Sequence, residues 1–274
     1  MNICDAVRGQ ADVDLGLKDR VAIVAASSQG IGKAGALGLA REGAKLALCA
    51  RAAATLEATA EEIRTQTGAQ VFAEPVDVTS YEHVQRFVTH TRERFGGVDI
   101  FVANAGGPPS KSFAETTIED WLAAVNLNLM STVYFAREVL PGMRERHWGR
   151  FIAITSITVK QPAEGLILSN SVRSAVSGLL KSLANEYGPY NVLVNNVCPG
   201  YTATARLESL TGKLAAAEGV PVEKVRERWA SQVPLRRLGQ PEEFANLVVF
   251  LASERASYIT GVSVPVDGGL VKGV

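Results

Sequence analysis

The chain is poor in the residue types that build metal sites and disulfide frameworks. Its 274 residues include three cysteines and three histidines, and the histidines show no metal-ligand spacing. Cys49 and Cys198 lie in apolar segments without a nearby histidine or cysteine, where a free cysteine behaves as a small buried hydrophobic residue. We therefore expect no metal site.

The sequence also lacks a long apolar run and an excess of either charge. No stretch is uninterrupted enough to span a bilayer, and the amino terminus has no apolar region typical of a signal peptide. Lys and Arg together number 28, as do Asp and Glu, so the charge gives no reason to expect nucleic acid or an anionic membrane as a partner. These absences favour a cytoplasmic protein that acts on a small molecule.

What the chain does have is a regular alternation of short apolar runs and longer segments of helical period. Near-continuous runs of Val, Ile, Leu and Ala suit strands that are buried on both faces. The alternation therefore predicts an α/β fold with one doubly wound parallel sheet of the Rossmann type. The predicted strands are 21–25, 45–49, 71–74, 99–103, 150–154, 192–197 and 261–266, and the predicted helices are 31–41, 54–67, 81–95, 118–146, 169–187 and 241–252.

Two segments fall outside this alternation. Residues 1–16 lack periodicity and are predicted to form a flexible tail before a single domain over 17–274. A long insertion between Pro199 and Pro234 contains helical runs but no strand. Such an excursion is more often an active-site lid than a separate domain, so we expect a helical substrate lid at about 205–231.

Residues 21–51 are predicted to form a strand, a glycine-containing turn, a helix and a second strand, which is the context that a dinucleotide-binding motif requires. Gly30 and Gly32 would let the backbone approach a pyrophosphate at the N-terminus of the helix from Ile31, where free N–H groups and the helix dipole favour an anion. The alternative is a glycine turn that only packs the helix against the strand. The polar residues of the turn are Ser27 and Ser28.

Arg51 follows the second of these strands, where an NAD-binding protein places Asp or Glu to hold the ribose 2′-hydroxyl. A guanidinium without a carboxylate at this position favours a 2′-phosphate, and hence NADPH over NADH. Alternatively, Arg51 is a solvated surface charge.

Further segments resemble those of the short-chain dehydrogenase/reductase family, and in particular its oxoacyl-carrier-protein reductase branch. The matching segments are spread over residues 17–270. At the first glycine of the family's Thr-Gly-x-x-x-Gly-x-Gly motif this chain has Ala26, whose Cβ is strained if the turn needs a positive φ. The resemblance implies further cofactor contacts by Asp77, Val78, Asn104, Ala105, Gly106, Pro199, Gly200, Thr202 and Thr204.

The same resemblance implies the positions of a catalytic Asn, Ser, Tyr and Lys. The Asn falls on Asn128, with Asn126 as the fallback, and the Ser falls on Ser156 at the end of a strand. The Tyr and Lys positions hold Ser169 and Arg173 instead. Asn128 can equally serve only in capping or packing within its helix.

Ser169 and Arg173 are four residues apart on a predicted helix and therefore share one face. A serine alcohol is much less acidic than a tyrosine phenol, and an arginine, with a pKa above about 12, does not release its proton. Ser169 could supply a hydrogen bond, and Arg173 could hold the nicotinamide ribose or an anionic substrate. Substitute proton donors are the loop 160–164, Tyr201 and ordered water.

Two functions are compatible with these residues. The first is an NADP-dependent oxidoreductase of a carbonyl or alcohol with a non-standard proton donor. The second is a non-redox protein on the same scaffold, either a lyase or isomerase that uses Ser156, Ser169 and Arg173 or a cofactor-binding sensor or inactive partner subunit. Resemblance in the C-terminal segment implies a homo-oligomer, a tetramer or a dimer, with a turn over 267–269 at the interface.

Overall fold

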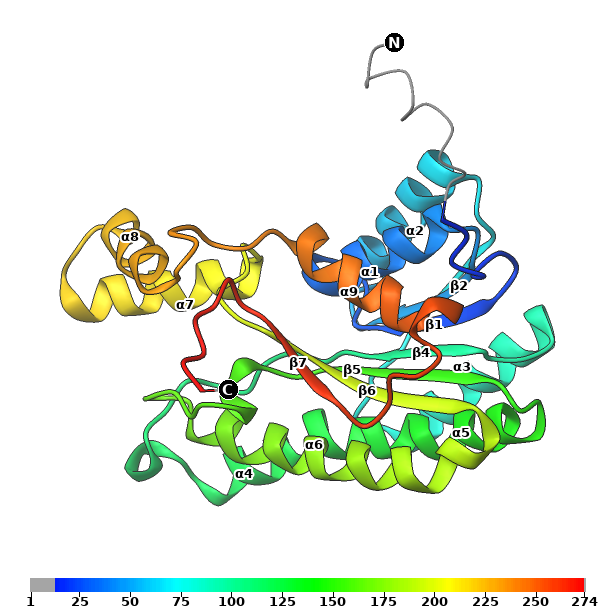
Figure 1. Ribbon diagram of the computed structural model, residues 1–274. Coiled ribbons are helices and arrows are strands. Elements are labelled where there is room, and N and C mark those ends of the chain that lie inside the picture. Colours follow the sequence, from blue (N-terminus) through cyan, green and yellow to red (C-terminus); the bar gives the residue numbers. More distant parts are fainter. Residues whose placement is uncertain (1–12, 274) are drawn as a thin grey trace, which may run out of the picture.

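One parallel sheet of seven strands forms the centre of the molecule (Figure 1). The computed structural model describes residues 13–273. The strand order is β3-β2-β1-β4-β5-β6-β7, and every neighbouring pair is parallel. The strands are β1 (Val21–Ala25), β2 (Lys45–Ala50), β3 (Val71–Pro75), β4 (Ile100–Ala103), β5 (Gly149–Ile154), β6 (Val192–Pro199) and β7 (Ser263–Val266).

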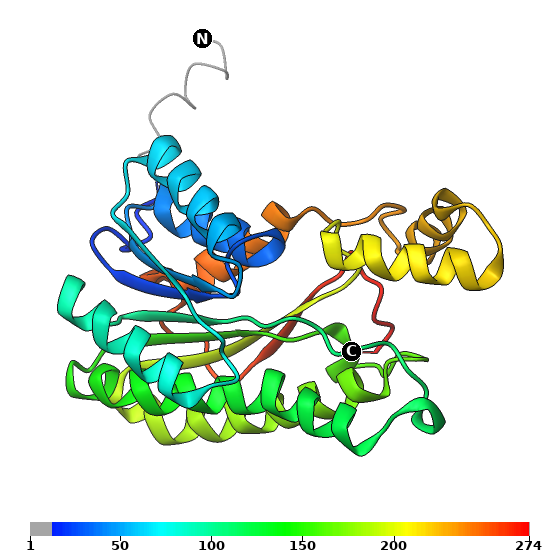
Figure 2. The same ribbon diagram turned by 180° about the vertical axis from the view of Figure 1, so that it is seen from behind.

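Helices cover both faces of this sheet, which is why β1 and β4 are apolar along their whole length. All residues of β1, β4 and β5 are buried. One core cluster joins the sheet to α1 (Gly30–Arg41), α2 (Ala53–Thr67) and α9 (Pro241–Ala252). A second cluster joins the opposite face to α3 (Tyr81–Phe95), α5 (Ser131–Glu145) and α6 (Ile167–Tyr187), as Figures 1 and 2 show from two sides. The predicted α/β fold with a doubly wound parallel sheet is confirmed.

The predicted helix over 118–146 is wrong as a continuous α-helix. It consists of α4 (Ile118–Ala124), a six-residue π-helix η3 (Val125–Met130) and α5. The wider turn of a π-helix shifts the direction of the side chains that follow, and such turns are frequent at functional sites. Asn128 lies within this turn.

The insertion after β6 forms two helices, α7 (Ala205–Glu218) and α8 (Val222–Gln232), which extend beyond one end of the sheet (Figures 1 and 2). Of the predicted tail over 1–16, residues 1–12 lie outside the described residues. Leu15 O accepts a hydrogen bond from Glu254 N at 3.0 Å, and Asp14 O accepts one from Arg255 Nε at 2.9 Å. Among the helices of residues 13–273, none is long and apolar enough to cross a membrane.

The strand order reverses between β1 and β4. The chain proceeds from β1 through β2 to β3 on one side and from β4 through β7 on the other. In open parallel sheets, ligands bind at the carboxyl ends of the strands next to such a switch point. The segments that follow β1, β4, β5 and β6 are therefore the place to look for a site.

Candidate active site

The loop between β1 and α1, residues 26–29 together with Gly30 at the start of α1, is called the nucleotide loop below and has the backbone geometry of a tight phosphate-binding turn. Ala26 has a φ of +47° and Gly30 a φ of +58°, so an alanine occupies the left-handed region that glycine tolerates best. A Cβ placed on Gly32 would lie 2.5 Å from Ala26 O and 2.8 Å from Asn104 Nδ2. Asn104, directly after β4, donates its own hydrogen bond to Ala26 O at 3.2 Å. Gly32 therefore lets α1 pack directly beneath the loop.

The N-terminus of α1 opens toward the space above the sheet. Its N-cap residue, Gln29, makes no side-chain capping bond, and the first turn has no acidic residue. Free N–H groups and the helix dipole thus leave a positive end available to an anion. Thr204 lies beside it, because a Cβ on Gly30 would lie 3.4 Å from Thr204 Cγ2.

The segment after β6 reaches this helix end through a close contact with the C-terminal turn. Gly200 N donates to Val266 O at 3.0 Å, and a Cβ on Gly200 would lie 2.6 Å from Asp267 Cβ. Thr202 pairs with Gly239 as an isolated bridge, and Thr204 Oγ1 then caps α7 by accepting from Leu207 N. The structure thus brings Pro199, Gly200, Thr202 and Thr204 to the same sheet edge as the nucleotide loop.

Arg51 and Asp77 lie at the other side of the nucleotide loop, at the ends of β2 and β3. Thr79 donates to Asp77 Oδ1 from its backbone at 3.0 Å and from its hydroxyl at 2.7 Å, and these bonds, followed by the charge of Arg51, lower the pKa of Asp77. Arg51 itself is exposed. Ser27 is buried and donates to Cys49 O at 3.4 Å, so its side chain holds the loop to β2.

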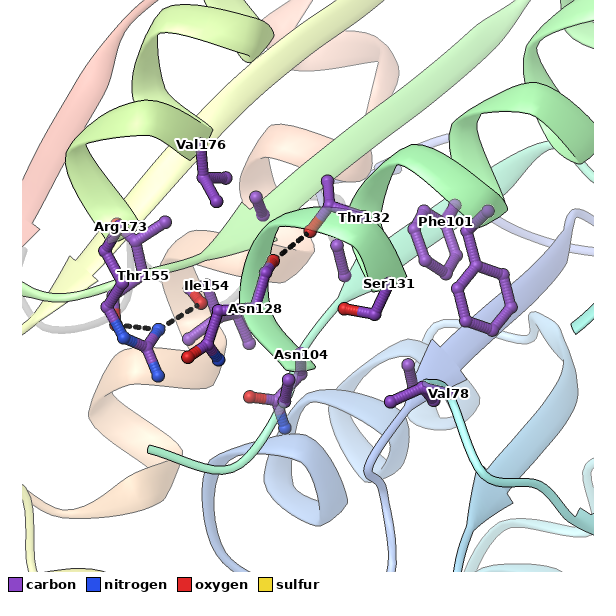
Figure 3. A pocket seen from close by; sticks show the side chains of 15 residues that line it. Val78, Phe101, Asn104, Asn128, Ser131, Thr132, Ile154, Thr155, Arg173 and Val176 are labelled. Atoms are coloured by element: carbon purple, nitrogen blue, oxygen red, sulfur yellow. Dashed lines mark hydrogen bonds between the residues drawn. The ribbon is translucent and has the colours of Figure 1, made fainter. Parts of the chain in front are cut away.

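Two of the four predicted catalytic residues, Asn128 and Arg173, line a narrow cavity between the ends of β4 and β5, η3 and α6 (Figure 3), whereas Ser156 and Ser169 are not part of its lining. Its volume of about 20 Å³ is room for about one water molecule. Figure 3 shows Arg173, Asn128 and Asn104 around it. The other predicted site residues on its wall are Val78 and Ala105.

Arg173 is a buried, hydrogen-bonded cation. Its Nη1 donates to Ile154 O at 3.1 Å and to Thr155 O at 2.7 Å, and its side chain is 8% exposed. Burial, followed by repulsion from Arg206, lowers the pKa of Arg173 to about 10. It is therefore still charged at neutral pH and serves as a fixed positive charge rather than as a proton donor.

Ser169 meets Thr158, a residue that we did not single out from the sequence. The two hydroxyl oxygens are 3.4 Å apart, and both side chains are buried. Ser156 Oγ accepts from Thr158 N at 3.1 Å and caps the 3₁₀ turn η4 (Ile157–Val159). Three hydroxyl groups thus meet where η4 packs against α6. Ser156 can donate its O–H to another oxygen atom, and so can one of the pair Ser169 and Thr158, because the other O–H of that pair is used in their mutual hydrogen bond.

The two candidate asparagines of η3 face different partners. Asn128 is buried, its Nδ2 donates to Gly106 O at 2.9 Å, and its Oδ1 is buried without a hydrogen-bond partner among the described residues. Asn126 donates instead to Thr79 O at 3.3 Å, on the side of Asp77. Asn128 is therefore the residue that lies at the cavity.

Tyr201, one of the three substitute proton donors considered above, packs against α8. Its ring stacks on Trp229 with centroids 4.8 Å apart, and its hydroxyl donates to Gln232 Oε1 at 3.3 Å. Burial raises its pKa. In the loop 160–164, Lys160 is exposed, and Asn170 holds Ala163 through a pair of hydrogen bonds, 3.3 Å to its N and 2.9 Å to its O.

Arg206, at the start of α7, is the second site residue that the sequence analysis missed. Its Nη2 donates to Pro108 O at 2.6 Å, and a Cβ on Gly107 would lie 3.1 Å from its guanidinium. The signal in the sequence was its position two residues after Thr204. In the stretch 13–273, no group of three or more His, Cys, Asp or Glu side chains could hold a metal ion.

Comparison with known proteins agrees with this geometry over almost the whole chain. A family model described as enoyl-(acyl carrier protein) reductase matches residues 25–271. The chain is 33% identical to the 3-oxoacyl-(acyl-carrier-protein) reductase of Aquifex aeolicus, over 94% of this chain and 100% of that protein. It is also 33% identical to the acetoacetyl-CoA reductase of Shinella zoogloeoides, over 91% of this chain and 98% of that one.

Among solved structures, the L-sorbose reductase of Gluconobacter frateurii in complex with NADPH and L-sorbose superposes with a TM-score of 0.91 at 36% identity. The match covers 96% of this chain and 100% of the reductase. With the sheet order, the glycine loop and these similarities together, the chain belongs to the short-chain dehydrogenase/reductase family, in the branch of the oxoacyl-carrier-protein reductases.

Proposed function

We propose that the protein is an NADP(H)-dependent oxidoreductase that interconverts a carbonyl and an alcohol, with a proton donor other than tyrosine. The observation that carries the proposal is the open N-terminus of α1, where Gly32 packs directly under Ala26 and Thr204 lies beside Gly30. A turn that served only to pack a helix on a strand would not need a second segment, from the other half of the sheet, at the same place. The relatives named above are reductases, which agrees with this assignment.

The residues present fit a dinucleotide phosphate. The α1 N-terminus, with Gly30, Ile31 and Gly32, would hold the pyrophosphate, and Arg51 the 2′-phosphate. Ser28, Asp77, Val78, Asn104, Ala105 and Gly106 would line the adenosine and nicotinamide ribose side, and Pro199, Gly200, Thr202 and Thr204 the nicotinamide side. When bound, NADPH supplies a hydride to the carbonyl carbon.

The protein's own side chains must then stabilise the oxygen that becomes an alkoxide. Ser156 and Ser169 would orient the substrate oxygen by hydrogen bonds, because both hydroxyls contact Thr158 in the turn that follows β5. Arg173 adds a buried positive charge that favours the negative oxygen. The proton would come from water, because Arg173 keeps its own and Tyr201 is bound to the lid. Asn128, whose Oδ1 lacks a partner, would hold a water molecule at the cavity.

The experiment that tests this function is a titration with NADPH and NADH followed by an assay of NADPH consumption with a panel of ketones and aldehydes. The proposal expects binding of NADPH in preference to NADH and turnover of at least one carbonyl compound. Binding without turnover on any substrate, in a folded protein, would favour the non-redox alternative, a lyase, isomerase or sensor. The specific observation that favours this alternative is that Ser169 and Arg173 occupy the positions of the tyrosine and lysine.

We also propose that the protein is a homo-oligomer, a tetramer or a dimer. Tyr258, after α9, is fully exposed, and Phe250 and Val262 nearby are exposed as well, which suits a self-complementary apolar interface. A monomeric mass in light scattering at micromolar concentration would overturn this proposal.

A further inference from the structure

Two arginines from different elements lie on the same side of the candidate site. Arg173 comes from α6 and lines the cavity together with Asn128. Asn128 Nδ2 donates to Gly106 O, and the next residues, Gly107 and Pro108, carry the guanidinium of Arg206. A short run of backbone after β4 thus contacts both Asn128, which shares the cavity wall with Arg173, and the guanidinium of Arg206.

Neither guanidinium forms an ion pair with a carboxylate within residues 13–273. The recorded hydrogen bonds of Arg173 all come from Nη1 and go to backbone carbonyls, and that of Arg206 goes from Nη2 to a backbone carbonyl. Other arginines of the lid region behave differently. Three of them meet a glutamate, in the pairs Arg226–Glu208, Arg228–Glu218 and Arg237–Glu243.

The two positive charges repel each other, since the charge of Arg206 contributes to lowering the pKa of Arg173. Holding two like charges near a partly dry site is unfavourable unless a ligand compensates them. A planar guanidinium with free N–H groups matches a carboxylate in shape and charge, and Arg206 remains exposed and therefore accessible from the lid side.

We propose that Arg206, supported by the charge of Arg173, binds a carboxylate of the substrate, so that the substrate is an oxo acid or the corresponding hydroxy acid rather than a neutral ketone or alcohol. This inference rests on the proposed carbonyl–alcohol chemistry. It adds a specificity-determining residue at the base of the lid. Arg206 acts by binding and does not take part in proton transfer.

The test compares acids with their methyl esters, which differ only in charge at the recognised group. NADPH consumption is measured with 4-oxopentanoate and 2-oxobutanoate and with the methyl ester of each. A charge-assisted hydrogen bond contributes about 1.5–3 kcal/mol, so we expect kcat/KM for at least one acid to exceed that for its ester by about 10–100-fold. Arg206→Met should remove this difference by lowering kcat/KM for the acid and leaving that for the ester unchanged, and Arg206→Lys should restore part of it.

The matched control is Lys213→Met. Lys213 is an exposed cation on the same helix, two turns further along the same face, and about 10 Å along the axis from Arg206. It should leave both substrates unchanged. NADPH affinity is titrated for every variant, because Arg206 lies near Thr204 and could contact the cofactor instead. A loss of NADPH affinity in Arg206→Met without a change in acid-over-ester preference would overturn the proposal.

Binding without turnover separates this inference from the proposed function. Calorimetry with 4-oxopentanoate and its methyl ester is done in the presence of NADP⁺ for the wild type and for Arg206→Met. Preferential binding of the acid, lost in the variant, with no NADPH consumption, supports the carboxylate site and overturns the redox function. Reduction of acids and esters at equal kcat/KM supports the redox function and overturns the carboxylate site. If neither acid binds or is reduced, the carboxylate site is overturned as well.

Discussion

By the family resemblance, an alanine falls at a motif glycine in the nucleotide loop, whereas a serine and an arginine fall at the tyrosine and lysine positions on α6. The nucleotide loop keeps its shape, because Ala26 adopts a φ of +47° and Gly32 still packs beneath it. On α6 the backbone is equally regular, but the chemistry of the side chains is different. We propose that the cofactor side acts mainly through backbone N–H groups, which tolerate a changed side chain, whereas the tyrosine expected on the catalytic side is an ionisable group that a serine does not replace.

The largest effect is expected from restoring that ionisable group. The double variant Ser169→Tyr, Arg173→Lys should raise kcat/KM for ketones by about 100-fold or more, because a positioned general acid typically contributes 10²–10⁴. Ser169→Tyr alone should gain less, because Arg173 keeps its proton. NADPH consumption with a ketone panel measures both.

Thermal unfolding and an NADPH titration must first show that the double variant is folded and binds cofactor. If such a protein gains no activity on any ketone, more than the proton donor distinguishes this protein from the reductases of its family. If the native protein has an activity that depends on Ser169 and Arg173 themselves, the double variant should lose it.

The second prediction concerns the close contact between Gly32 and the backbone of the nucleotide loop. Gly32→Ala places a Cβ 2.5 Å from Ala26 O, so it should destabilise the fold by about 1–3 kcal/mol and weaken NADPH binding by displacing the loop. Gly35→Ala is the control, because it lies on the same helix with no atom within 4 Å of its Cβ position. It should leave NADPH binding unchanged and stabilise α1 by up to about 1 kcal/mol. Equal behaviour of the two variants in thermal unfolding would show that the loop is not close-packed.

A smaller effect is expected from Arg51, the side chain proposed to bind the 2′-phosphate. Arg51→Ala should reduce the preference for NADPH over NADH by about tenfold, since an exposed charge-assisted contact to a phosphate contributes on the order of 1.4 kcal/mol. Arg41→Ala, at the last turn of α1, removes an exposed cation away from the loop and serves as the control. Unchanged affinities for both cofactors in Arg51→Ala would remove Arg51 from the site.

The smallest predicted effect is relief of the strained alanine. Ala26→Gly should raise the midpoint of thermal unfolding by about 2–4 °C, because glycine adopts the left-handed region without a steric penalty and the net gain is at most about 1 kcal/mol. Asp19→Gly is the control, because Asp19 has a similar positive φ of +63° and lies far from the loop. Tighter NADPH binding in Ala26→Gly but not in Asp19→Gly would show that Ala26 lowers the affinity of the loop for NADPH.

The order of strands and helices could be predicted because burial on both faces forces long apolar runs on the parallel strands. β1 is apolar at every position, and the helices between the strands show the helical period. The helix over 118–146 could not be predicted correctly, because no local pattern distinguishes a π turn from an α turn. The path of η3 is set by its packing against α6 and by the contact of Asn128 with Gly106.

In the candidate site, residues tied to a strand end or a glycine turn could be predicted, and residues that depend on a distant partner could not. Ser156 follows β5, and Gly30 begins α1, so local order places them. Arg206 matters because its guanidinium reaches Pro108, a residue 98 positions earlier. Thr158 matters because α6 brings Ser169 to it.

Thr204 contacts both the nucleotide loop and the start of α7, which matters for any exchange of the insertion between family members. It starts the first lid helix and also lies against Gly30 of the nucleotide loop. At the other end of the insertion, Val233 is buried, and a Cβ on Gly268 would lie 2.6 Å from its Cγ1. Lids transplanted from other members of the family should therefore be spliced after Leu207 and before Val233, which leaves the cofactor contacts on the recipient and transfers only the substrate-facing surface.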